Sequence, residues 1–89
     1  MIEKQLDIIN KLGLHARAAA KVVSVASRYE SRIHVIHNGN PIDAKSIMGL
    51  LMLGAAKGTS GTFQVDGNDE TAAMEELTDL FGRRFDEEE

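Results

Sequence analysis

The stretch RIHVIHNGNPID, residues 32–43, predicts the β-hairpin from which the fold is built outward. Ile33 and Val35 share one face of the first strand because side chains alternate along a β-strand. Asn38-Gly39 is a strong hairpin signal, since both central residues of a type I′ turn need positive φ. Pro41 in the return strand offers no N–H to a ladder, which places that strand at a sheet edge.

Two other segments alternate in the same way. Near the N-terminus, Ile2, Leu6 and Ile8 are separated by polar or charged residues, the pattern of a half-buried strand. Thr59 to Asp66 repeats the pattern, with Phe63 and Val65 on one face. Together with the hairpin strands, Arg32 to His37 and Asn40 to Asp43, these segments predict four strands.

Three segments instead repeat apolar residues at helical spacing. They are Ala16 to Tyr29, Ile47 to Leu53, and Glu70 to about Arg84. Ser46 is a good N-cap for the second helix, and Gly54 fits its end in the left-handed conformation. We expect the first and third helices to bury Ala19, Val22, Val23, Ala26, Tyr29, Ala73, Leu77 and Leu80, with Phe81 or the stem of Arg84 as further candidates.

The element order βαββαβα predicts an α+β fold with an antiparallel sheet covered by helices on one side. Eighty-nine residues are the size of one domain, and no internal repeat is present, so we expect a single domain over residues 1–89.

Composition narrows the class of protein. A net charge of −4 and 4% aromatic residues argue against a nucleic-acid binder, which needs clustered cations and stacking platforms. The charged residues within Met1 to Asp7 do not fit a signal peptide, and no apolar run approaches a membrane span. With no cysteine, the chain fits a reducing compartment, so we expect a cytoplasmic protein. The acidic run Asp86 to Glu89 predicts a solvated, frayed tail.

The segment Gly13-Leu14-His15-Ala16-Arg17 carries the chemistry, because it lies where a loop meets the first helix. A helix start presents unpaired N–H groups and the positive end of the macrodipole, here the amides of Ala16 and Arg17, which favour an anion. Neutral imidazole has a free lone pair that attacks phosphorus, and the guanidinium of Arg17 suits phosphate oxygens. The alternative is that His15 is only a capping or surface histidine.

Other candidate sites are weaker. His34 and His37 lie on opposite faces of a strand and do not converge on one metal, so we expect no metal site. Gly54 to Gly61 lacks the Gly-Lys-Ser/Thr ending of a nucleotide-binding loop. The chain also offers no convergent carboxylate pair and no nucleophile–base couple, so we expect a carrier that needs no cofactor rather than an independent enzyme.

The chain resembles the HPr family, the histidine-containing phosphocarriers of the phosphoenolpyruvate-dependent phosphotransferase system. Asn10 to Arg17 is similar to that family's active-site stretch, and Lys45 to Leu53, continued by Gly54 to Thr59, to its second helix and the serine before it. The resemblance covers nearly the whole chain. It implies an open-faced β-sandwich, phosphorylation of His15 at Nδ1 by Enzyme I, and transfer to IIA proteins.

One departure from the family pattern is Ala18, where the commonest motif has proline. Proline would pre-set φ in the first turn, whereas alanine restores an N–H and remains an excellent helix former. We expect the site to survive this change. Ala18 and the Phe85-Asp86-Glu87 ending leave both the sugar-transport and the nitrogen-related branch open.

Ser46 and the helix after it suggest contacts with partners. The resemblance implies that Ser46 is a regulatory serine, phosphorylated in some bacteria by an HPr kinase. This helix has more apolar surface than one buried stripe needs, from Ile47, Met48, Leu51 and Met52. The excess predicts a docking patch formed by Ile47, Met48 and Leu51. The alternative function is an HPr-like regulatory binding module controlled at Ser46. A carrier that exposes one face to successive partners is most simply a monomer.

Overall fold

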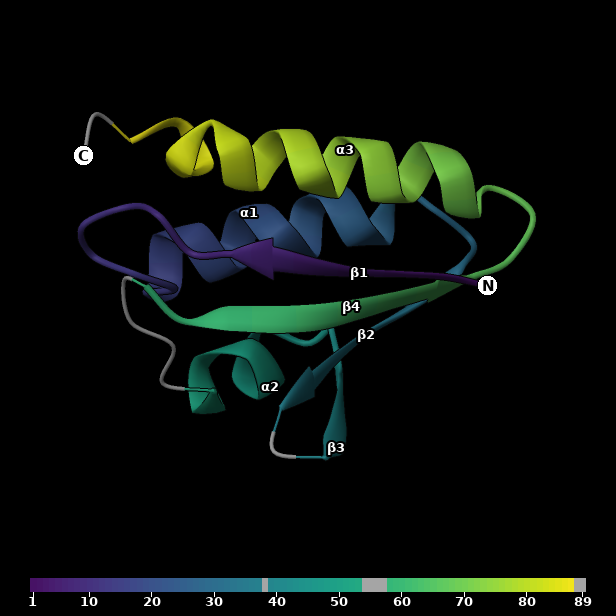
Figure 1. Cartoon of the computed structure of the whole chain (residues 1–89), viewed down its shortest axis with the longest axis horizontal. Coiled ribbons are helices and arrows are strands. Elements are labelled where there is room, and N and C mark those ends of the chain that lie inside the picture. The colour runs from purple at the N-terminus through teal and green to yellow at the C-terminus, as the bar shows by residue number, and fades with distance from the viewer. Residues whose placement is uncertain (38, 54–57, 88–89) are drawn as a thin grey trace.

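The computed structural model describes residues 1–37, 39–53 and 58–87. Figure 1 shows the strands with helices packed against them. In chain order the elements are β1 (Ile2–Asp7), α1 (Ala16–Ser27), β2 (Arg32–His37), β3 (Asn40–Asp43), α2 (Ile47–Met52), β4 (Ser60–Asp66), α3 (Glu70–Gly82) and a short turn of 3₁₀ type, η1 (Arg84–Asp86).

The strands form one sheet in the order β1-β4-β2-β3, and every neighbouring pair is antiparallel. The predicted α+β fold with a four-stranded antiparallel sheet is confirmed. In the hairpin, Pro41 of β3 pairs with Ile36 of β2, and β3 lies at the sheet edge as predicted. Asn38, the first residue of the predicted turn, lies outside the described residues, while Gly39 has the expected positive φ of 80°.

Alternate residues along the strands differ in burial, which shows that one face of the sheet is covered and the other is open. Ile33 and Val35 on β2 are buried, as is Phe63 opposite Val35 on β4. At the margin of the covered face, the exposed side chain of Lys4 on β1 reaches α3, where its Nζ donates to Oγ1 of Thr78 at 3.3 Å. The helices thus lie on one side of the sheet, as the open-faced β-sandwich requires.

Helix α1 is central to the helical layer, since it contacts both α2 and α3. Its buried residues are Ala18, Ala19, Val22, Val25 and Ala26. The predicted Val23 and Tyr29 are only partly buried, and Ala18 and Val25 take the deeper positions. The helix ends at Ser27, two residues before the predicted Tyr29. The buried residues of α1 therefore differ in part from those predicted.

The third helix ends earlier than predicted. Helix α3 stops at Gly82 and buries Ala73, Met74, Leu77, Leu80 and Phe81, whereas the stem of Arg84 is exposed. Arg84, Phe85 and Asp86 all have positive φ, between 56° and 63°, so the chain here turns left-handed. Phe85 occupies the core position instead of Arg84, with its ring centroid 4.8 Å from that of Phe81.

Helix α2 begins after Ser46, whose Oγ accepts a hydrogen bond from the N–H of Gly49 at 3.2 Å, so the predicted N-cap is present. The helix ends at Met52 rather than Leu53, and Gly54 lies outside the described residues. Leu50 is the residue of α2 that is fully buried.

Candidate functional site

His15 is the N-cap residue of α1 and has extended backbone geometry, with φ −80° and ψ −179°. Its carbonyl accepts the N–H of Ala19 at 2.8 Å, which begins the helical ladder. Its ring Nδ1 accepts a hydrogen bond from the backbone N–H of Arg17 at 3.2 Å. The imidazole therefore lies at the amide end of the helix, where an anion is favoured.

Arg17 is exposed in the first turn of α1, which contains no acidic residue. Within the described part of the chain, its guanidinium forms no hydrogen bond or ion pair. A cation at a helix N-terminus is opposed by the macrodipole, so the position is favourable only with an anion nearby. The arrangement gives an incoming phosphate two kinds of donor, the backbone amides and the guanidinium.

The other ring nitrogen of His15 faces a carboxylate from the C-terminal end of the described chain. Nε2 lies 2.5 Å from Oε2 of Glu87. Because Nδ1 accepts a hydrogen bond from Arg17, the ring proton is on Nε2, and this N–H donates a hydrogen bond to Glu87. The contact is largely sheltered, since the His15 side chain is 27% exposed and that of Glu87 is 13% exposed.

Asn10 links the loop before α1 to the same carboxylate. Its Nδ2 donates to Oε1 of Glu87 at 2.5 Å and to the carbonyl of Gly13 at 2.8 Å. Asn10 is fully buried, and its Oδ1 has no hydrogen-bond partner among the described residues. Gly13 turns the loop with φ of 68°, a conformation that favours glycine, and delivers the chain to His15.

Helix α1 also holds the left-handed turn that precedes Glu87. The Nζ of Lys21 donates to the carbonyl of Phe85 at 2.6 Å and lies 3.5 Å from Asp86. The prediction of a solvated, frayed tail is therefore wrong for Glu87, while Asp86 is exposed but lies against Lys21. Glu88 and Glu89 lie outside the described residues. Burial of Phe85 and the bonds from Lys21 keep this segment on the protein surface.

Hydrogen bonds set the ionisation of Glu87. The hydrogen bond from His15, and then that from Asn10, lower the pKa of the Glu87 carboxyl below its usual range. Burial of the group acts in the opposite direction and is outweighed. Glu87 is thus a carboxylate at neutral pH and accepts a hydrogen bond from the ring N–H, while the proton stays on Nε2.

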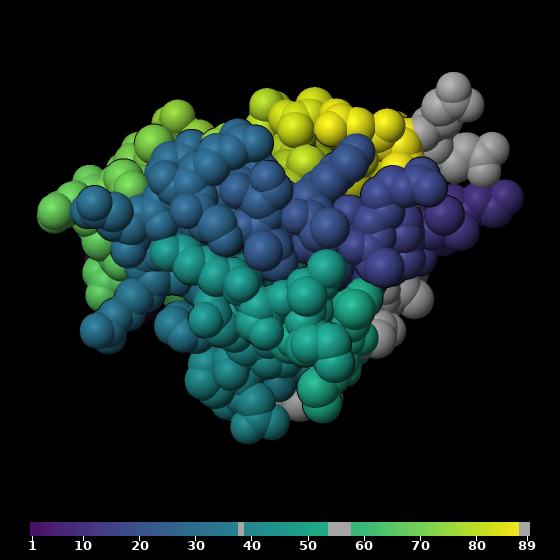
Figure 2. Space-filling model, turned by 180° about the vertical axis from the view of Figure 1, so that it is seen from behind, coloured from purple at the N-terminus to yellow at the C-terminus, as the bar shows by residue number. Residues whose placement is uncertain are grey.

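The predicted docking residues lie on α2, which packs beside α1. Ile47, Met48 and Leu51 are all exposed, and Met48 is 66% exposed. Figure 2 shows the α2 segment, in teal, next to the blue and purple start of α1 on one face of the molecule. The exposed apolar residues and the His15 segment thus belong to adjoining elements.

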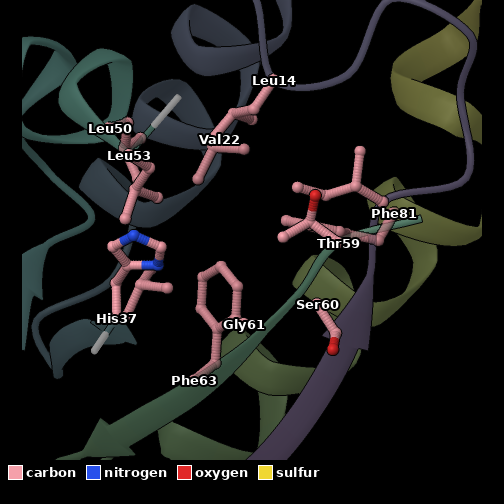
Figure 3. A pocket seen from close by; sticks show the side chains of 12 residues that line it. Leu14, Val22, His37, Leu50, Leu53, Thr59, Ser60, Gly61, Phe63 and Phe81 are labelled. Carbon is pink, nitrogen blue, oxygen red and sulfur yellow. The ribbon is translucent and has the colours of Figure 1, made fainter. Parts of the chain in front are cut away.

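The described residues also line a small cavity inside the molecule (Figure 3). Its volume is about 20 Å³, enough for roughly one water molecule. The side chains of Leu14, Val22, Leu50 and Phe63 face it, whereas His15 and Arg17 do not line it. The cavity is therefore a gap in core packing rather than a substrate cleft.

Comparisons with known proteins agree with this architecture. The family model described as the PTS HPr component phosphorylation site matches residues 2–83. The phosphocarrier protein HPr of Neisseria meningitidis serogroup A is 49% identical over 89 residues, which are the whole of both chains. HPr-C-His from Thermoanaerobacter tengcongensis has a structure that matches with a TM-score of 0.95 at 42% identity, over the whole of both chains.

These matches define a phosphocarrier of the phosphotransferase system. The chain belongs to the HPr family. An HPr dimer from T. tengcongensis also matches, with a TM-score of 0.75 at 40% identity over 98% of this chain and all of that one. Because a relative is seen as a dimer, the monomer stays a prediction for this chain. No helix within the described ranges has the length and apolar character to cross a membrane.

Sequence reasoning singled out His15, Arg17 and Ser46 but missed Asn10 and Glu87 as neighbours of the ring. Asn10 lies within the quoted family-like stretch, where a polar residue in a loop gave no sign that it is fully buried. Glu87 lies 72 residues from His15 and in an acidic run. The only available signal was Phe85, an aromatic residue too apolar for a solvated tail.

Proposed function

We propose that Nδ1 of His15 accepts a phosphoryl group from Enzyme I and passes it to IIA proteins. The observation that carries this proposal is the position of Nδ1, which faces the backbone N–H of Arg17 at the amide end of α1. The lone pair of Nδ1 is free to attack phosphorus once that weak hydrogen bond yields. The negative oxygens of the product then meet the amides of Ala16 and Arg17 and the exposed guanidinium.

The stabilisation of the phosphorylated form is modest, which suits a carrier. A contact with the helix dipole contributes about 0.3–1 kcal/mol when exposed and up to ~2 kcal/mol when partly buried. A much tighter site would hold the phosphoryl group rather than release it. The exposed residues Ile47, Met48 and Leu51 lie on α2, which packs against α1, and we assign the docking of both donor and acceptor to them.

The experiment is to mix the protein with phosphoenolpyruvate, magnesium and Enzyme I and to follow acid-labile, base-stable phosphate. The native chain should become labelled, and His15→Ala should not. His34→Ala is the matched control, because it removes another imidazole from β2 without touching α1, and its labelling should equal that of the native chain. Label that persists in His15→Ala, or that never appears in the native chain, would defeat the proposal.

A further inference from the structure

The imidazole of His15 is held at both nitrogens, and its second partner is a side chain that the proposed function does not use. Nδ1 faces the N–H of Arg17 at 3.2 Å, and Nε2 faces the carboxylate of Glu87 at 2.5 Å. Asn10 binds the other carboxylate oxygen, also at 2.5 Å. Both oxygens of Glu87 therefore have partners, and its orientation toward the ring is fixed.

An unusual backbone brings Glu87 to this position. Arg84, Phe85 and Asp86 have φ values of 56°, 56° and 63°, a region that non-glycine residues seldom enter. Such residues persist only where their surroundings over-determine them. Here the buried ring of Phe85 and the bond from Lys21 to its carbonyl do so. These contacts hold the segment in the conformation that places Glu87 against His15.

We propose that Glu87 is a positioning residue for His15: it holds the Nε2 proton and supplies a negative charge beside the ring when Nδ1 carries a phosphoryl group. This inference rests on the proposed function. As the Nδ1 lone pair forms the N–P bond, the bond from phosphorus to the donor breaks and its electron pair leaves with the donor. The Nε2 proton stays, so the ring becomes cationic, and a hydrogen bond to a carboxylate stabilises that form.

The same contact favours onward transfer. When the phosphoryl group leaves for an acceptor, the electron pair of the N–P bond returns to Nδ1. A ring that has kept its Nε2 proton then departs as neutral imidazole rather than as an anion, which makes it a better leaving group. The carboxylate of Glu87 does not oppose the phosphoryl group closely, because the two ring nitrogens lie on different edges of the imidazole. The positive charge of Arg17 also acts on the Glu87 carboxylate and lowers the pKa of that group, after the hydrogen bonds from His15 and Asn10.

The test compares native protein with Glu87→Gln, which keeps an oxygen acceptor but no charge, and Glu87→Ala, which has neither. Glu75→Gln is the matched control, since it removes an exposed carboxylate from α3 by the same substitution and leaves the turn before Glu87 intact. Each protein is phosphorylated chemically with phosphoramidate, and hydrolysis of the N–P bond is followed by ³¹P NMR across pH. Hydrolysis is fast while the ring is protonated.

We expect the pH at which hydrolysis slows to fall by about half a unit or more in Glu87→Gln and Glu87→Ala, and to stay unchanged in Glu75→Gln. Coincident profiles for all four proteins would overturn the inference. In the unmodified proteins, the Nε2–H resonance of His15 should be visible in all except Glu87→Ala, and its persistence there would equally overturn it. Failure of Enzyme I to phosphorylate the native chain would defeat the proposed function alone, because phosphoramidate needs no enzyme.

Discussion

The backbone N–H of Arg17 points at Nδ1 of His15 across 3.2 Å, while the Arg17 side chain is exposed. The main chain of one residue thus marks where a phosphoryl group would bind, and its guanidinium is available to the same group. The two contributions are separable, because a substitution of the side chain leaves the amide in place.

Arg17→Ala should therefore slow phosphoryl transfer without unfolding the protein. Losing hydrogen bonds to a charged group costs roughly one to two powers of ten in rate. Alanine is also the better helix former, so the thermal midpoint should not fall. Rapid-quench measurement of transfer from Enzyme I gives the rate. Arg28→Ala, at the other end of α1, is the control, and equal rates in the two variants would refute this role of Arg17.

Met48→Asp tests the docking surface on α2. Met48 is 66% exposed, so the substitution should change the free energy of unfolding by no more than about 0.5 kcal/mol. If the exposed apolar residues bind the donor, the KM for the protein partner should rise by roughly tenfold. Ala72→Asp introduces the same charge on the exposed face of α3. A KM that rises equally in both variants would indicate a general charge effect rather than docking.

Ser46 has a structural role that can be separated from its proposed regulatory one. Its Oγ caps α2 by accepting the N–H of Gly49, so Ser46→Ala should lower stability by about 1 kcal/mol in urea unfolding. Ser46→Asp keeps a capping oxygen and should stay near native stability. If a negative charge here repels an acidic partner, Ser46→Asp should transfer phosphoryl groups more slowly than Ser46→Ala. Equal transfer by the two variants would exclude regulation through charge.

The described fold was predictable where local pattern and tertiary structure agree. The alternation in β2 follows from side-chain periodicity and the edge position of Pro41 from its missing N–H, and both are present in the structure. The stripe of α1 was predicted only in part, because Ala18 and Val25 are buried more deeply than Val23. Glu87 could not be found in this way, because its contact with His15 joins positions 72 residues apart. It also depends on left-handed backbone at non-glycine residues, which local propensity opposes and which the burial of Phe85 and the bond from Lys21 to its carbonyl stabilise.

Asp69 should make stability depend on pH at the acidic end. Its carboxylate accepts hydrogen bonds from the Ser31 hydroxyl and from the N–H groups of Glu30 and Ser31. The Ser31 hydroxyl, and then the Glu30 amide, lower the pKa of Asp69. A carboxyl whose pKa is lower in the folded state stabilises the fold above its unfolded pKa, and that contribution is lost as pH falls through the folded pKa.

Asp69→Asn should consequently lower the thermal midpoint at pH 7 by roughly 4–8 °C, the effect of losing about one net hydrogen bond in a domain of this size. The difference from the native protein should shrink below about pH 4, where the unfolded carboxyl protonates. Asp7→Asn removes an exposed carboxylate from β1 and is the control. A difference that stays constant from pH 7 to pH 3 would show that the charge of Asp69 contributes nothing.

Gly67 and Gly82 should respond to alanine in opposite directions. A Cβ at Gly67 would lie 2.7 Å from the Cα of Ser31, so backbone must move, and φ of 156° adds strain. Gly67→Ala should lose about 1–3 kcal/mol of unfolding free energy. Gly82 ends α3, and no atom of the described residues beyond its own stretch of helix lies within 4 Å of an added Cβ. Gly82→Ala should therefore gain up to about 0.5 kcal/mol from helix propensity. Urea unfolding measures both, and a neutral Gly67→Ala would mean that the junction between β2 and β4 yields more readily than its close backbone contact implies.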